Sequence, residues 1–267
     1  MEVALAELPR GLAHMAPSLF SAARRAPRDW PGRAWLDSGG YRILKGRALD
    51  VSSVAKRLVS ARAEVKFSLD FPPSPEDDCE TAKAKELATA LVYAKLSARA
   101  DVVPVVHFHP CVDVLKAARA YEGSRRIALG GAVPYALRHK AMLPEVLKAV
   151  GALAEVGFQV HVFGLASPLL LPKLAEVGAY SADSANWRLK AAHGKVALPW
   201  GGERHVTPRG FSFGGRRITR EELEGLAEWL ASRNCDAPRD AEGLLSALQN
   251  HDFRLYVNAC VLTRLVR

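Results

Sequence analysis

Cysteine pairs and long apolar runs are missing from this sequence of 267 residues. Its four cysteines, at positions 79, 111, 235 and 260, form no Cys-x-x-Cys pair, which argues against a local zinc knuckle and against the disulfide framework of a small secreted protein. No apolar run approaches the roughly 20 residues that span a bilayer. The first residues lack the positive region and the apolar region of a secretory signal peptide. We therefore expect a cytoplasmic protein with no membrane contact.

Acidic residues are scarce from Arg188 to Arg220, where eight Lys or Arg residues accompany a single acid, Glu203. The whole chain has a formal net charge of +9 and an isoelectric point near 9.6, and such a charge favours a polyanionic partner. A solvated basic surface is the alternative interpretation. Because the stretch directly follows the candidate site described below, nucleic acid is the preferred partner. The candidate contacts are Arg188, Arg204, Arg209, Arg216 and Arg217.

Apolar segments of strand length alternate with helical segments along most of the chain. Continuous apolar runs such as residues 102–108 are typical of parallel strands that are buried on both faces. The expected strands cover residues 2–6, 33–36, 64–69, 102–108, 127–129, 158–163, 180–183 and 195–198. Eight strands close a TIM barrel, so we expect an α/β fold with a TIM (β/α)8 barrel.

The sequence also predicts how this fold divides along the chain. We expect the barrel to occupy residues 1–200. Residues 201–267 are expected to form a small C-terminal extension, a basic loop followed by helices that pack on the barrel. A short helix is expected around residues 18–25, before the second barrel strand.

Four of the expected strands end in a carboxylate or a glycine pair. The carboxylates are Asp37, Asp70 and Asp183, and the glycine pair is Gly130-Gly131. Because α/β proteins build active sites at the carboxyl ends of parallel strands, we expect these residues to meet in one pocket, with Asp183 as the reacting residue. Taken singly, Asp183 is explained as the cap of the following helix, and Asp37 and Asp70 as parts of turns.

Five short motifs follow one another in a fixed order between residues 34 and 187. They are Asp37-Ser-Gly-Gly-Tyr41, Leu69-Asp-Phe-Pro-Pro73, Leu129-Gly-Gly-Ala-Val-Pro134, His161-Val-Phe-Gly164 and Ala182-Asp-Ser-Ala185. Together they resemble the tRNA-guanine transglycosylase superfamily, which includes a DNA-modifying 7-deazaguanine branch. The resemblance implies a TIM barrel in which guanine leaves a nucleotide and a 7-deazaguanine base replaces it. It implies nucleic acid and that base as partners and no cofactor, and it leaves a homodimer open.

The resemblance also implies a role for each matching residue. Asp183 is the nucleophile that forms a covalent glycosyl-enzyme intermediate, as in retaining glycosidases, and Asp37 is the acid/base residue. Asp70 accepts hydrogen bonds from the base, and Tyr41 and Phe163 enclose it. The substrate-binding set is Asp70, Tyr41, His107, Gly130, Gly131, Phe163 and Gly164.

Two features depart from the family pattern. His107 stands where the family usually has a glutamine, and a ring nitrogen is still able to donate a hydrogen bond to the base carbonyl. The cysteines of the family's zinc site are missing between Trp187 and Asn234, although His251 falls at the position of its histidine ligand. Because thiolates supply most of that site's ligands, we expect no structural zinc.

Two other functions stay open alongside the glycosyltransferase. His107, His109 and His161, with nearby carboxylates, suit a metal-dependent, amidohydrolase-like barrel enzyme. A non-catalytic subunit that binds nucleic acid would keep the pocket and the basic residues, but such a protein needs no nucleophile. For the preferred function, tRNA and DNA both stay open as the substrate.

Overall fold

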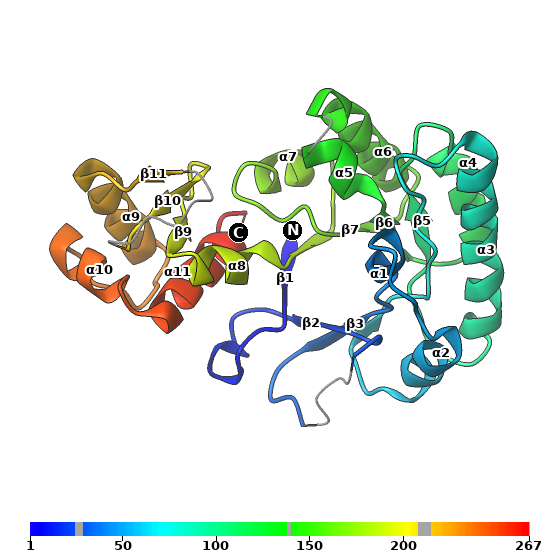
Figure 1. Cartoon of the computed structure of the whole chain (residues 1–267), viewed down its shortest axis with the longest axis horizontal. Coiled ribbons are helices and arrows are strands. Elements are labelled where there is room, and N and C mark those ends of the chain that lie inside the picture. The colour runs from blue at the N-terminus through cyan, green and yellow to red at the C-terminus, as the bar shows by residue number, and fades with distance from the viewer. Residues whose placement is uncertain (25–28, 138–139, 208–214, 267) are drawn as a thin grey trace.

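The computed structural model describes residues 1–24, 29–137, 140–207 and 215–266. Its main element is a curled sheet of eight strands in the order β4-β3-β2-β1-β8-β7-β6-β5, with all neighbours parallel (Figure 1). The strands are β1 (Glu2–Ala6), β2 (Ser18–Ser21), β3 (Ala34–Asp37), β4 (Val65–Lys66), β5 (Val105–His107), β6 (Arg126–Gly130), β7 (Gln159–Val162) and β8 (Ser181–Ser184). Because the strands are parallel, all their carboxyl ends lie along one edge of the sheet.

The two end strands of this order, β4 and β5, approach each other. A parallel bridge joins Phe67 and Val103 just outside the strands, with backbone hydrogen bonds of 2.7 Å from Val103 to Lys66 and 2.8 Å from Ser68 to Val103. No continuous ladder joins β4 to β5 among the residues that the structure describes. The fold is therefore α/β with a barrel-like parallel sheet that is not closed by strand pairing.

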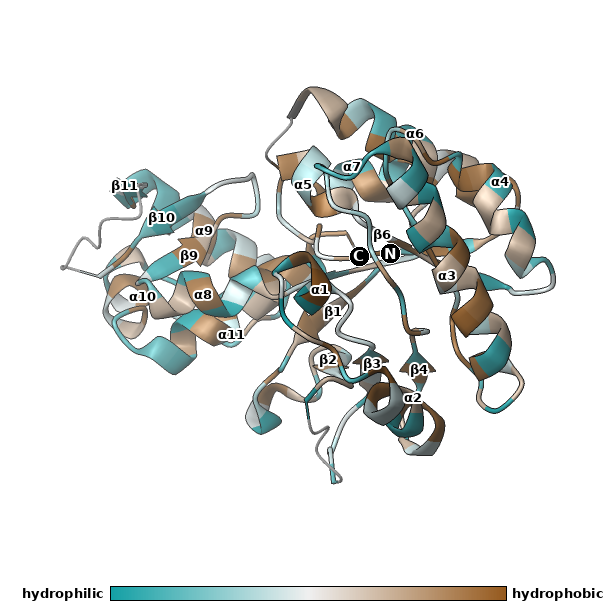
Figure 2. Ribbon diagram, turned by 45° about the vertical axis from the view of Figure 1, so that its right-hand side comes forward, coloured by the Kyte–Doolittle hydropathy of each residue, from teal (hydrophilic) through white to brown (hydrophobic). Residues whose placement is uncertain are grey.

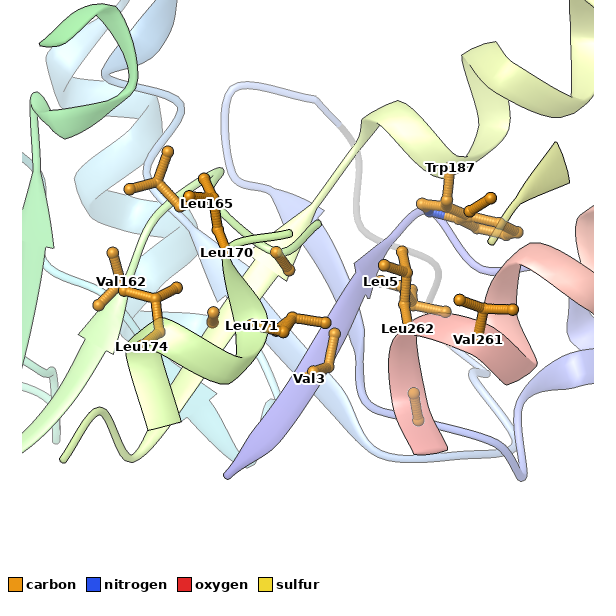
Figure 3. Packing of buried hydrophobic residues seen from close by; sticks show 14 of the residues in the cluster. Val3, Leu5, Val162, Leu165, Leu170, Leu171, Leu174, Trp187, Val261 and Leu262 are labelled. Atoms are coloured by element: carbon orange, nitrogen blue, oxygen red, sulfur yellow. The ribbon is translucent and has the colours of Figure 1, made fainter. Parts of the chain in front are cut away.

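Side chains alternate between two buried faces along each strand. On β1, Val3 and Leu5 belong to the core under the helices, whereas Ala4 packs in the concave interior with Trp35 and Phe67. Figure 3 shows Val3 and Leu5 beside apolar side chains of the covering helices. Burial on both faces explains why β1 and β6 contain consecutive apolar residues.

Helices cover the convex face of the sheet (Figure 1). They are α2 (Val51–Ser60), α3 (Cys79–Ser97), α4 (Val114–Ala118), α5 (Ala132–Leu137), α6 (Leu143–Glu155), α7 (Leu171–Glu176) and α8 (Asn186–Ala192), with short 3-10 turns at Arg10–Leu12, Arg119–Tyr121 and Lys140–Met142. The short helix α1 (Tyr41–Leu44) follows β3 and lies instead at the carboxyl edge of the sheet. Asp50 caps α2 by accepting a 3.0 Å hydrogen bond from the Ser53 N–H, which satisfies a free donor of the first turn. Among the described helices, none combines the length and the apolar character needed to cross a membrane.

In the described residues of the C-terminal part, a second sheet is accompanied by three helices. Its elements are β9 (Lys195–Ala197), β10 (Glu203–His205), β11 (Arg216–Arg217), α9 (Arg220–Ser232), α10 (Ala241–Ala247) and α11 (His251–Arg264). The small sheet lies with α9 and α10 beside the main sheet (Figures 1 and 2). Helix α11 connects the two parts because it packs on α8, β9 and β1. The helices after residue 219 agree with the expectation from sequence.

Two expectations about strands are wrong. The segment expected as a helix at residues 18–25 begins with β2, because Ser18 to Ser21 pair with β1 and β3 and this pairing outweighs a weak local preference. The expected barrel strand at residues 195–198 is β9, which pairs antiparallel with β10 in the small sheet. This hairpin spans residue 200, so the expected domain boundary falls inside a structural unit.

A disulfide joins Cys79 at the start of α3 to Cys111 in the loop after β5, with the Cα atoms 5.1 Å apart. Cys235 and Cys260 are free and buried. The disulfide was not expected from the spacing along the chain, because the fold brings together two cysteines that are 32 residues apart.

Candidate active site

A cavity of about 910 Å³ opens at the carboxyl edge of the main sheet. It is lined by the ends of strands that are far apart in the sequence, as the rule for parallel sheets requires. The sequence-predicted residues that line it are Asp37, Tyr41, Asp70, Gly130, Gly131, Phe163, Gly164, Asp183 and Arg188. The structure therefore gathers at least one residue from each of the five motifs in a single cavity.

Asp183 lies at the end of β8 with only 6% of its surface exposed. Its Oδ1 accepts a 2.8 Å hydrogen bond from the backbone N–H of Gly164. The following helix, α8, has Ala185 at its N-cap and no side-chain cap. The interpretation of Asp183 as a helix cap is therefore excluded, and its carboxylate faces the cavity.

Asp37 is held at the end of β3 by a short turn. The Gly39 N–H donates a hydrogen bond to Oδ2 of Asp37 at 3.1 Å. This contact is the turn contact that the sequence suggested for Asp37. Burial, followed by the charges of Asp70 and Asp183, nevertheless raises the pKa of Asp37 to about 8. At neutral pH Asp37 is therefore a protonated carboxylic acid beside two other carboxyl groups.

Asp70 is fixed by side chains rather than by its own turn. Its Oδ1 accepts a 2.5 Å hydrogen bond from the Ser38 hydroxyl, and its Oδ2 lies 3.1 Å from Nε2 of His107. Gly40 is required beside it, because a Cβ there would lie 2.4 Å from Oδ1 of Asp70. The position of this carboxylate in the cavity is thus set from three sides.

His107 is fully buried and does not line the cavity. Its Nδ1 lies 2.7 Å from Oε2 of Glu86, and its Nε2 faces Asp70. Burial lowers the pKa of His107, but the charges of Glu86 and Asp70 outweigh burial and raise it to about 9. Both ring nitrogens are therefore occupied, and the expected hydrogen bond from His107 to a base is replaced by support of Asp70.

Aromatic rings and glycines form the remaining walls. Tyr41 in α1 is exposed, whereas Phe163 after β7 is partly buried and packs on Phe67 at 4.8 Å. Gly130 has no room for a side chain, because a Cβ there would lie 2.9 Å from Cδ2 of His107. Gly131 has a φ of +69°, a backbone conformation that residues other than glycine rarely adopt. Backbone is thus exposed to the cavity where a flat ligand would contact it.

The predicted basic contacts that the structure describes lie on different elements, and Arg188 is the one among them that lines the cavity. Arg188 lines the cavity and pairs with Glu7, which also pairs with Arg24 at 2.9 Å. Arg204 pairs with Glu222 at 2.6 Å and is mostly buried, so it is not available to a polyanion. Arg216 and Arg217 are exposed in β11 on the small sheet, and Arg209 lies outside the described residues.

The three histidines considered for a metal site each contact a different partner. His107 is paired with carboxylates, His109 accepts a 3.2 Å hydrogen bond from the Cys111 N–H, and His161 lies near Asp183. Burial lowers the pKa of His109. No group of three metal-ligating side chains gathers within the described ranges. Among these residues, His107, His109 and His161 therefore do not gather into one ligand set.

Three groups at the site were missed in the sequence. Glu7 follows β1 directly, so the rule of strand-end residues that selected the other carboxylates also points to it. Ser38 lies inside the first motif. Glu86 was hidden in α3, but Ala82, Glu86 and Thr89 share the buried face of this helix. A charged residue on such a face is the signal for Glu86.

Comparison with known proteins adds one relative. The chain is 28% identical over 222 residues to a protein of Sulfolobus islandicus rod-shaped virus 1 that is named uncharacterized protein 306; the match covers 82% of this chain and 68% of the viral protein. No family model matches the chain. The name of the viral protein assigns no activity.

Proposed function

We propose that this protein is a guanine transglycosylase that exchanges guanine in nucleic acid for a 7-deazaguanine base, on a TIM-type barrel. The observation that carries the proposal is the pairing of two different carboxyl groups in one cavity. Asp183 is positioned by the Gly164 N–H, while the raised pKa keeps Asp37 protonated. A protonated carboxylic acid and a second carboxyl group in one cavity are suited to the roles of acid and nucleophile.

In the first step, a carboxylate oxygen of Asp183 bonds to the anomeric carbon while the bond from that carbon to the guanine nitrogen breaks. The departing nitrogen takes the proton of Asp37. In the second step, Asp37 accepts the N–H proton of the incoming base, whose nitrogen attacks the anomeric carbon and releases the Asp183 carboxylate. Each bond formed is matched by one broken, and Asp37 returns to its protonated state.

The base is recognised at Asp70. Its two oxygens already accept hydrogen bonds from Ser38 and His107, and a carboxylate that lines the cavity is able to accept further hydrogen bonds there. A guanine or 7-deazaguanine edge offers a ring N–H and an amino group, which complement such a carboxylate. Tyr41 and Phe163 supply stacking surfaces, and Gly130 and Gly131 supply backbone.

A nucleic-acid substrate fits the charge at the cavity mouth. Arg188 and Arg24 both line the cavity, and the target nucleotide has to leave its stack to reach Asp183. Phosphates that flank the nucleotide are able to replace Glu7 as the partner of these arginines. Both tRNA and DNA present this chemistry, and the test below separates them.

The test is exchange of radiolabelled guanine into tRNA and into duplex DNA, run side by side with purified protein. We expect label to enter one of the two polymers and to be displaced by an added 7-deazaguanine base. Binding of both polymers without exchange would instead support the non-catalytic nucleic-acid-binding function.

A further inference from the structure

His161 occupies the concave interior directly below the cavity. It lies on β7 with 3% of its surface exposed. Its ring packs against three aromatic rings, with centroids 5.6 Å from Trp35, 4.6 Å from Phe67 and 4.8 Å from Phe163. The ring is therefore held in one place by apolar contacts, and its two nitrogens are left to make specific polar contacts.

Both nitrogens of His161 face β8. Nδ1 lies 2.9 Å from the hydroxyl oxygen of Ser181, and Nε2 lies 3.4 Å from Oδ1 of Asp183. His161 and Ser181 are register partners in the sheet, and Asp183, two residues further on, faces the same side. Within the described residues, Nε2 has no hydrogen-bond partner, so Asp183 is the acceptor within its reach.

We propose that His161 is a positioning residue that donates its Nε2–H to Oδ1 of Asp183, and that the free oxygen, Oδ2, is the one that attacks the sugar. An unprotonated Nε2 would direct its lone pair at a carboxylate oxygen, which is repulsive. With Nε2 protonated, the Ser181 hydroxyl is able to donate to Nδ1. The distance of 3.4 Å is long for a hydrogen bond, as is common for catalytic contacts without substrate.

This inference rests on the proposed function, and it assigns His161 to one of the two steps. Oδ1 then has two donors, His161 and the Gly164 N–H at 2.8 Å. When Oδ2 bonds to the sugar, Asp183 loses its charge and the two hydrogen bonds weaken. When the bond between the sugar and Oδ2 breaks, the charge returns, and the donors stabilise the departing carboxylate. His161 should therefore assist release of the glycosyl group more than its capture.

The test compares two substitutions that differ in hydrogen bonding. His161→Phe fits the aromatic surroundings but has no donor, whereas His161→Gln keeps an N–H donor. We expect His161→Phe to slow exchange on the order of 10- to 100-fold, the effect of one hydrogen bond to a charged group. The covalent protein–nucleic acid adduct, measured on denaturing gels, should accumulate in His161→Phe and return towards the wild-type level in His161→Gln. Slow exchange without adduct accumulation, or unchanged exchange, would overturn the role of His161.

A second measurement does not require activity. Nitrogen-15 NMR of histidine-labelled protein reports which ring nitrogens carry hydrogen, and the signals missing from His161→Phe identify His161. We expect Nε2 of His161 to be protonated in the resting protein, and an unprotonated Nε2 would overturn the inference. Wild-type protein that makes neither adduct nor exchanged product would overturn the proposed function, while the NMR result still decides the contact with Asp183.

Discussion

The Nδ1 atom of His107 lies 2.7 Å from Oε2 of Glu86, and through this contact a residue of α3 controls a carboxylate of the cavity. The same ring reaches Oδ2 of Asp70 at 3.1 Å. All three side chains are buried. A positive ring between two carboxylates satisfies both, whereas loss of one partner leaves an uncompensated buried charge.

This arrangement predicts how stability depends on pH. Because the pKa of His107 is raised to about 9, the stabilisation is complete below pH 6.5, the ordinary value, and is lost as the pH rises through 9. Between these values its contribution to the free energy of unfolding should fall by about 1.4 kcal/mol per pH unit. His107→Gln should remove this contribution in urea unfolding, which leaves the slope due to Asp37 below pH 8 and none between pH 8 and pH 9. His109→Gln, the control, should keep the contribution of His107. An unchanged slope in His107→Gln would show that the ring is neutral.

Asp70 and Glu86 should differ in how directly they affect the base. Asp70→Ala removes a charged acceptor, so affinity for a free 7-deazaguanine base should fall by about 1.5–3 kcal/mol. Glu86→Gln changes only the support that Asp70 receives through His107, so it should lower the affinity for the base less than Asp70→Ala does. Isothermal titration with the free base measures both. Unchanged affinity in Asp70→Ala would mean that Asp70 has a purely structural role.

The raised pKa of Asp37 predicts a second pH effect, on activity as well as on stability. Its pKa of about 8 is above the ordinary 3.8, so Asp37 loses its proton as the pH rises through 8, and kcat/KM for nucleic acid should fall there. The raised pKa also lowers the stability of the wild type as the pH rises from 3.8 to 8, so Asp37→Asn should be more stable than the wild type above pH 8 and inactive in exchange. Activity that stays constant from pH 7 to pH 10 would contradict the role of Asp37 as the acid.

The sequence was sufficient to predict those residues of the candidate site that lie at the carboxyl ends of strands. Asp37, Gly130 and Asp183 come from different motifs, and they share a cavity because parallel strands end at one edge. β2 was missed because its conformation depends on pairing with neighbours rather than on its own residues. The contact of Glu86 with His107 crosses from a helix to a strand, and the spacing of residues along the chain contains no such information.

Binding of nucleic acid should depend on Arg188 more than on Arg204. Arg188→Ala removes a cation at the cavity mouth and should lower the slope of log affinity against log salt by about 0.7–0.9. Arg204 is engaged with Glu222, so Arg204→Ala should reduce stability and leave the slope unchanged. Fluorescence anisotropy with labelled oligonucleotides at several salt concentrations measures the slopes.

The small sheet gives a third arm of this experiment. Substitution of both Arg216 and Arg217 by Glu should weaken binding and flatten the salt dependence if β11 contacts the polymer, and should leave binding of the free base unchanged. Equal slopes for this double variant and the wild type would limit the binding surface to the cavity mouth. Equal slopes for Arg188→Ala and the wild type would remove the proposed phosphate contact.

The central claim, that Asp183 forms a covalent bond with the sugar, is tested most directly by guanine exchange in wild-type protein and in Asp183→Asn. Asparagine keeps the size of the side chain and its acceptor for the Gly164 N–H, so the fold should persist by circular dichroism. We predict labelled guanine in the polymer and a covalent adduct with the wild type, and neither with Asp183→Asn. Exchange at the wild-type rate by folded Asp183→Asn would contradict the mechanism.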